Sequence, residues 1–137
     1  LFRSVRAGAA IDLTRLTLFS RWLTPSIMPK RFDTFFYLAA APAQQFARFD
    51  GRETVDCEWI APSEALRLAA AGERNMVVPT RLNLQLLASS DTLAAAVDAA
   101  SRRSMEVVTP RVEVRDGKRY LVIDSNAGYG EVLELRP

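Results

Sequence analysis

The sequence contains no histidine, so this chain supplies neither a histidine ligand to a metal nor the histidine base of a serine or cysteine nucleophile. Its single cysteine, Cys57, excludes an internal disulfide and is compatible with a reducing compartment, so we expect a cytoplasmic protein. No apolar run approaches the length of a membrane span, and we expect no membrane partner. The net charge is only +2 and the arginines are scattered, so we expect no nucleic-acid partner.

What is present is the composition of an ordinary globular domain. The chain has 137 residues, of which 49% are hydrophobic and 25% charged, which suits one domain over residues 1–137. It begins at Leu1, and its first residues have the pattern of a helix end, with Gly8 at a C-cap position. We therefore expect a piece of a longer polypeptide, entered partway through a helix.

Three strands are predicted in the first half of the chain. Residues 16–22 alternate, and a loop bracketed by Pro25 and Pro29 follows them. Residues 33–40 are apolar on both faces after the first two positions, which predicts a strand in the middle of a sheet with helices on each side. Residues 53–60 alternate and predict a half-buried strand nearer an edge.

Three helices are predicted after these strands. Pro62 begins the first helix and Gly72 ends it, because proline suits the first helical position and glycine the C-terminal end. Pro79 begins the second helix, and the third spans residues 92–102. The apolar side of the third helix is predicted to be Leu93, Val97 and Ala100.

A hairpin is predicted near the end of the chain. Asp116-Gly117 is a two-residue turn signal between strand-like segments at 110–114 and 120–123. The order of strands, helices and hairpin predicts an α+β fold. We expect a mixed sheet flanked by helices on both faces, an α/β/α sandwich, with a C-terminal β-hairpin.

Candidate binding residues gather where the strands at 16–22 and 33–40 meet their connecting loop. Arg21 and Arg31 could hold substrate phosphates through their guanidinium groups, or could be surface charges that pair with Asp33. Trp22 could stack on a base, or could pack in the core. Asp33 could orient Arg31 rather than touch a ligand.

The segments RWLTP at 21–25 and PKRFDTFF at 29–36 resemble the central part of Nudix hydrolases. More narrowly, they are similar to the branch that includes coenzyme A diphosphatase-like members of peroxisomes and bacterial relatives. Further similar stretches lie at 51–66, 78–82, 116–117 and 128–130. The resemblance implies a partial Nudix-like fold and hydrolysis of a nucleoside-diphosphate-linked substrate, such as a coenzyme A-like molecule, with Mg²⁺ or Mn²⁺ in the complete enzyme.

The acid-rich signature of these hydrolases is missing from the chain. It consists of a Gly, five residues, a Glu, seven residues, then Arg-Glu-aliphatic-x-Glu-Glu-x-Gly. The only Arg-Glu pair here is Arg52-Glu53, and Asp56, Cys57 and Trp59 stand where the paired Glu residues and the final Gly belong. Because diphosphate cleavage by water needs metal, we expect this chain alone to be inactive and metal-free, with no catalytic residue of its own.

The resemblance implies that the chain is the C-terminal portion of a Nudix domain. An upstream segment or a partner chain would then supply the metal-binding signature. Arg21, Trp22, Arg31, Asp33 and Glu53 are predicted to bind substrate; Glu53 could instead be an extra metal ligand, a base or a solvated strand end.

The apolar strand at 33–40 would need a cover, from the missing segment, a partner or a second copy in a homodimer. The alternative function is a non-catalytic binding or interaction module, in which a partner completes an edge of the sheet.

Overall fold

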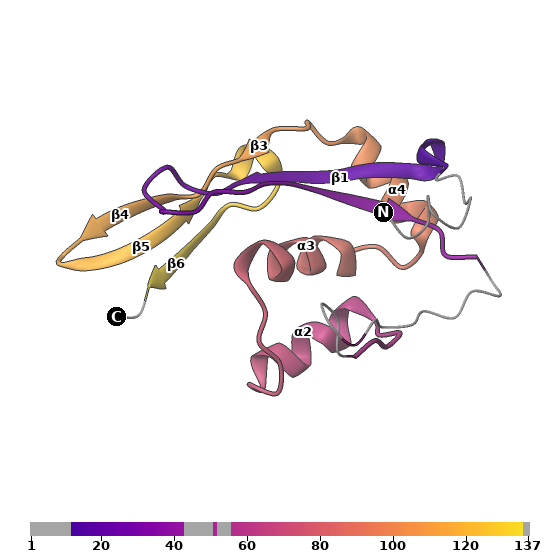
Figure 1. The fold of residues 1–137 in the computed structure, drawn as a ribbon, viewed down its shortest axis with the longest axis horizontal. Coiled ribbons are helices and arrows are strands. Elements are labelled where there is room, and N and C mark those ends of the chain that lie inside the picture. The colour runs from indigo at the N-terminus through magenta and orange to yellow at the C-terminus, as the bar shows by residue number, and fades with distance from the viewer. Residues whose placement is uncertain (1–11, 43–50, 52–55, 136–137) are drawn as a thin grey trace.

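The computed structural model describes residues 12–42, 51 and 56–135. Figure 1 shows their helices and strands. In chain order these are η1 (Leu13–Arg15), β1 (Leu16–Leu23), β2 (Asp33–Ala39), α2 (Pro62–Ala70), α3 (Val78–Ala88), α4 (Leu93–Arg102), β3 (Val107–Val108), β4 (Arg111–Arg115), β5 (Lys118–Ile123), η2 (Ser125–Ala127) and β6 (Glu131–Leu135). The predicted α+β class is confirmed.

The first sheet is mixed and has β1 at its centre. β1 pairs antiparallel with β2 on one side and parallel with β3 on the other, in the order β2-β1-β3. The prediction that residues 33–40 form the buried central strand is therefore wrong. β2 is an edge strand in the described part of the chain, and its Phe35 and Tyr37 are 44% and 51% exposed. The described residues leave these two apolar side chains exposed, so another segment or chain could cover them.

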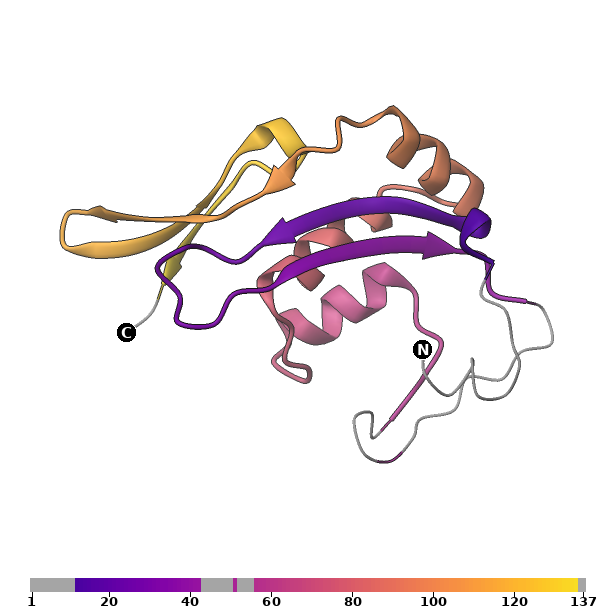
Figure 2. The ribbon, with the colours of Figure 1, turned by 45° about the horizontal axis from the view of Figure 1, so that its top comes forward.

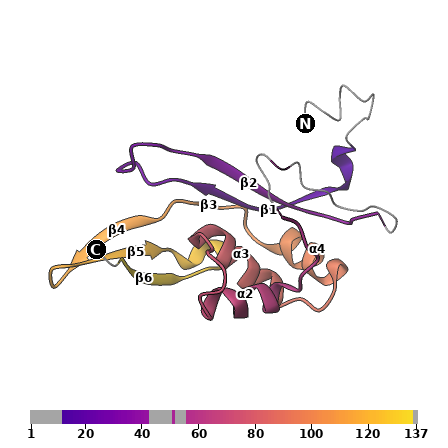
Figure 3. The same ribbon diagram turned by 60° about the horizontal axis from the view of Figure 1, so that its bottom comes forward.

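All three predicted helices are present, and α2, α3 and α4 lie on the same side of β1 and β2 in Figure 3. Pro62 is in the first turn of α2, and Gly72, with a φ of +75°, follows its end. Of the two helical layers expected of an α/β/α sandwich, the described residues supply one. No helix among them is long and apolar enough to cross a membrane.

The apolar side predicted for the third helix is partly wrong. Leu93 is 43% exposed, whereas Ala100 is buried as predicted and Ala96 is buried as well. Of the strand predicted at 53–60, residues 53–55 lie outside the described residues, while Asp56–Ile60 have no regular structure and Trp59 is 75% exposed. A strand needs a neighbour for its backbone groups, and no described strand lies beside this segment.

The second sheet is antiparallel, in the order β4-β5-β6, and extends away from the helices (Figures 1 and 2). Its first hairpin turns at Asp116 and Gly117, whose φ angles are +50° and +75°. Positive φ at both central residues is the requirement of a type I′ turn, whose twist matches that of the flanking strands. The predicted hairpin is confirmed.

One apolar core joins the two sheets to α3. Its buried members are Trp22, Leu82, Val108, Ile123 and Ala127. A register shift between Leu18 and Ser20 makes Phe19 an extra residue in β1, so Phe19 and Ser20 are both buried although they are consecutive. The bulge breaks the simple alternation that the sequence predicts for this strand.

Candidate functional site

Arg21 and Asp33 form a two-point ion pair between β1 and β2. Arg21 donates from Nε to Oδ1 of Asp33 at 2.9 Å and from Nη2 to Oδ2 at 2.7 Å. The register pairs Arg21 with Phe35 and Leu23 with Asp33, so the two charged residues are diagonal neighbours on adjacent strands. Asp33 therefore orients Arg21, and the expectation that it orients Arg31 is wrong.

Arg31 is used inside the loop that connects β1 to β2. Its Nε donates to the main-chain oxygen of Thr24 at 3.0 Å. The same loop is closed by Thr24, whose main-chain nitrogen donates to the carbonyl of Phe32 at 3.0 Å and whose hydroxyl accepts from the nitrogen of Phe32 at 3.0 Å. The Nε contact of Arg31 therefore has a structural role, and its exposed side chain lies two residues before Asp33 in the sequence.

Two exposed aromatic rings lie beside the Arg21–Asp33 pair. The guanidinium carbon of Arg21 is 4.8 Å from the centre of the Phe35 ring, and Phe35 stacks on Tyr37 with centroids 6.5 Å apart and planes 18° apart. We call Arg21, Asp33, Phe35 and Tyr37 the aromatic face. The central strand predicted at residues 33–40 would bury Phe35, but its place on an edge strand leaves its ring accessible. A cation beside accessible rings can contact both a phosphate and a planar group.

Trp22 does not belong to the aromatic face. It is 3% exposed and its ring meets Tyr129 edge-on, with centroids 5.0 Å apart and an interplanar angle of 62°. Because side chains alternate along a strand, Trp22 faces the core while Arg21 faces outward. Trp22 therefore packs in the core, which is the alternative to stacking on a base. Its ring has no exposed face for a ligand. Glu53 lies outside the described residues.

The ion pair shifts the titration of both partners. Hydrogen bonds from Arg21 lower the pKa of Asp33 from its ordinary value of 3.8, and the bond to Asp33 raises the pKa of Arg21. Both side chains are therefore charged near neutral pH. About two fifths of each side chain is exposed, so water screens the pair, and its main effect is to hold the guanidinium in one place.

We expect Asp33→Asn to lower the thermal midpoint near neutral pH, and this difference to shrink in acid. A carboxyl whose folded pKa is depressed contributes stability above its unfolded pKa, and the contribution is lost as pH falls through the folded pKa. Midpoints of both proteins at about pH 7 and about pH 2.5 measure this. A difference that is the same at both pH values would contradict a stabilising role for the ionised pair.

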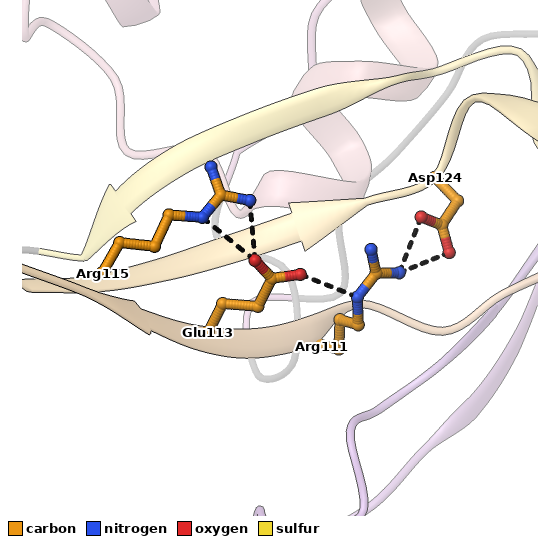
Figure 4. A network of polar contacts seen from close by, with 4 residues as sticks. All are labelled: Arg111, Glu113, Arg115 and Asp124. Carbon is orange, nitrogen blue, oxygen red and sulfur yellow. Dashed lines mark hydrogen bonds and ion pairs between the residues drawn. The ribbon is translucent and has the colours of Figure 1, made fainter.

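The acids that the structure describes do not fit a metal site. No three side chains of histidine, cysteine, aspartate or glutamate in that part of the chain lie close enough to hold an ion. Figure 4 shows why two of the acids are unsuitable: Glu113 lies between Arg115 and Arg111, and Asp124 accepts from Arg111. Hydrogen bonds from Arg115, then Arg111, lower the pKa of Glu113. Mg²⁺ requires several oxygen ligands in octahedral geometry, which these arginine-bound carboxylates do not offer.

A buried polar cluster joins β1, α3 and the segment before β6. The side-chain oxygen of Asn83 accepts from the hydroxyl of Ser20 at 2.8 Å and from the hydroxyl of Tyr129 at 2.5 Å. Ser20 and Asn83 are 5% and 6% exposed. The only sequence signal for this cluster is a polar residue beside Leu82 on an otherwise apolar helix face. The cluster positions Tyr129 against Trp22 and is structural.

Comparisons with protein-family models, with curated proteins and with solved structures found no match for this chain. The case for a function therefore depends on the residues and their geometry. Of the five residues predicted to bind substrate, Arg21, Arg31 and Asp33 lie at the same end of β1 and β2, and two aromatic rings extend that surface along β2.

Proposed function

We propose that this chain provides the substrate-side wall of a Nudix-type hydrolase that cleaves a nucleoside-diphosphate-linked substrate, such as a coenzyme A-like molecule, with Mg²⁺ or Mn²⁺. The two segments that resemble Nudix hydrolases, 21–25 and 29–36, are antiparallel neighbours. The observation that carries this function is the aromatic face, in which the oriented guanidinium of Arg21 lies beside the accessible rings of Phe35 and Tyr37.

A nucleoside diphosphate matches the chemistry of the aromatic face. Arg21 has five N–H donors and gives two of them to Asp33, so further donors can meet a phosphate. A planar base can stack on an exposed ring, which contributes about 1–3 kcal/mol per base in nucleic-acid complexes. Asp33 holds the guanidinium in place before the ligand arrives, which lowers the cost of ordering it.

The catalytic half of this function would come from elsewhere. The acids that hold the metal would be contributed by an upstream segment or a partner chain, which would also cover β2. The exposed rings of Phe35 and Tyr37 on an edge strand support such a cover. A cytoplasmic location, inferred from the single cysteine, is part of the same proposal.

A second candidate function is a non-catalytic binding or interaction module. The observation that favours it is the outer edge of β2, which pairs with no strand among the described residues. An extended segment of a partner, or β2 of a second copy, could add a strand there, with main-chain hydrogen bonds for affinity and Phe35 and Tyr37 for specificity.

ADP is the probe for the aromatic face. We expect the purified 137-residue chain to bind ADP, and Arg21→Gln to weaken binding by at least about tenfold, because a charge-assisted phosphate contact is lost. Isothermal titration calorimetry measures both affinities. Arg102→Gln is the matched control, since it removes a surface arginine that pairs with Asp98 on α4. Wild-type affinity of Arg21→Gln for ADP at β1 and β2, located by amide chemical shifts, would rule out this phosphate contact.

A turnover assay separates binding from chemistry. With Mg²⁺ and ADP-ribose, we expect no hydrolysis by the chain alone, because its described acids form no metal site. Hydrolysis would show that the chain carries its own catalytic residues. If the chain binds no ADP but self-associates, and Tyr37→Asp restores the monomer, the interaction module is the better description.

A further inference from the structure

A cavity lies in the helical layer, away from the aromatic face. It has a volume of about 610 Å³ and opens between α2, the connection that follows it, and α3. This volume is within the range of small-molecule sites, about 300–1,000 Å³. Val78 and Leu82 of α3 pack in the core with Trp22 and Phe36, so α3 covers the core side of β1 and β2. The aromatic face is on the other side of these strands.

Among the described residues that line this cavity, arginine is the only charged type. Arg67 comes from α2, Arg74 from the connection and Arg81 from α3, and the lining residues that the structure describes include no carboxylate. Ser63, Asn75 and Gln85 add a hydroxyl and two amides. Guanidinium groups from three separate segments around one cavity favour an anionic ligand with several acceptor oxygens, and phosphate matches the guanidinium fork best.

Two of the arginines pair with carboxylates that are not among the described lining residues of the cavity. Arg67 donates from Nε and Nη2 to Glu64 at 2.8 and 2.7 Å, and Arg74 pairs with Glu58. The hydrogen bonds to Arg67 lower the pKa of Glu64, so that pair stays ionised near neutral pH. Each guanidinium has five N–H donors, and such pairs use only part of them. The carboxylates therefore restrict the positions that these two guanidinium groups can take.

The rest of the wall suits an apolar or aromatic body. Leu66 and Met76 line the cavity together with two alanines of α2. Methionine adapts its shape to flat or irregular ligands. A ligand that fits this wall has a phosphate at one end and an apolar or aromatic group at the other, as a phosphate monoester of a nucleoside has.

We propose that the cavity between α2 and α3 binds a small molecule that carries a phosphate group, with Arg67, Arg74 and Arg81 around the phosphate. The ligand connects both helices and the segment between them, so it stabilises the helical layer. Because it binds only the folded chain, it raises the thermal midpoint with concentration. This site does not depend on the function of the aromatic face.

AMP tests this proposal, with adenosine as the phosphate-free comparison at constant ionic strength. We expect AMP to bind the full chain and adenosine to bind at least about tenfold more weakly. The double variant Arg74→Gln/Arg81→Gln should lose at least about tenfold in AMP affinity, while Arg102→Gln keeps its affinity. Calorimetry gives the affinities, and amide chemical shifts of α2 and α3 locate the ligand.

A second variant keeps the test decisive if the double variant fails to fold. Gln85→Glu changes an exposed amide of the cavity wall into a carboxylate of nearly the same shape, and should weaken AMP binding by about fivefold through repulsion. Wild-type AMP affinity in Gln85→Glu, or in a folded double variant, would overturn the site. So would an equal thermal shift from potassium chloride.

Discussion

Replacing Trp22 with alanine is expected to lower the free energy of unfolding by about 3–5 kcal/mol. Trp22 is 3% exposed and is the largest buried side chain of the core cluster. Its ring makes an edge-type contact with the ring of Tyr129, and it packs with residues from α3 and from both sheets. Its removal would leave a cavity at the point where these elements meet. Domains of this size are stable by only about 5–15 kcal/mol, so the variant is expected to be close to unfolding at physiological temperature.

Trp59→Ala is the matched control for Trp22→Ala. Trp59 is 75% exposed in a segment without regular structure, so its removal should change the free energy of unfolding by less than about 0.5 kcal/mol. Urea denaturation followed by circular dichroism measures both variants, because fluorescence would change with the loss of either tryptophan. Similar losses of stability in the two variants would contradict the central place of Trp22 in the core.

Replacing Asn83 with leucine is expected to cost about 2–4 kcal/mol, although leucine is similar in size and more apolar. The substitution removes the acceptor shared by the hydroxyls of Ser20 and Tyr129. Leaving a buried hydroxyl without a partner costs about 1–3 kcal/mol, and here two are affected. The unpaired hydroxyl of Ser20 should cost more than that of Tyr129, because Ser20 is 5% exposed while Tyr129 is only partly buried.

A double-mutant comparison separates the lost hydrogen bonds from changed packing. In the Asn83→Leu background, Tyr129→Phe removes one unpaired hydroxyl and should recover part of the lost stability. In the wild-type background, the same Tyr129→Phe change should be destabilising by about 1 kcal/mol, since it breaks a formed hydrogen bond. A Tyr129→Phe effect with the same sign and size in both backgrounds would mean that Asn83 and Tyr129 are not coupled.

The elements that could be predicted from the sequence are those with local causes. Pro62 and Pro79 indicate the starts of helices because the missing N–H is not needed there. Gly72 and the Asp116-Gly117 pair occupy positive φ angles that other residues rarely adopt. Each signal acts within a few residues, so the helices, the hairpin and the α+β class could be predicted from the sequence.

Which strand is central, by contrast, depends on its neighbours in space. Residues 33–40 have the apolar pattern of a central strand, yet β2 is at the edge and β1 is at the centre. The contacts of the predicted binding residues also depend on the tertiary structure. Arg21 and Trp22 are consecutive, but one points outward to Asp33 and the other into the core. The pairing of Asp33 with Arg21 rather than Arg31 follows from strand register, which no local signal encodes.

The sequence by itself determined where helices and turns begin and end, because propensity and backbone conformation act over a few residues. It also placed Arg21, Arg31 and Asp33 around one loop. Only the tertiary structure decided which side chains meet. Ser20 and Tyr129 lie 63 and 46 residues from Asn83, and the arginines of the α2–α3 cavity come from three segments. Such groups come together through packing of distant elements, which burial and strand register set for the chain as a whole.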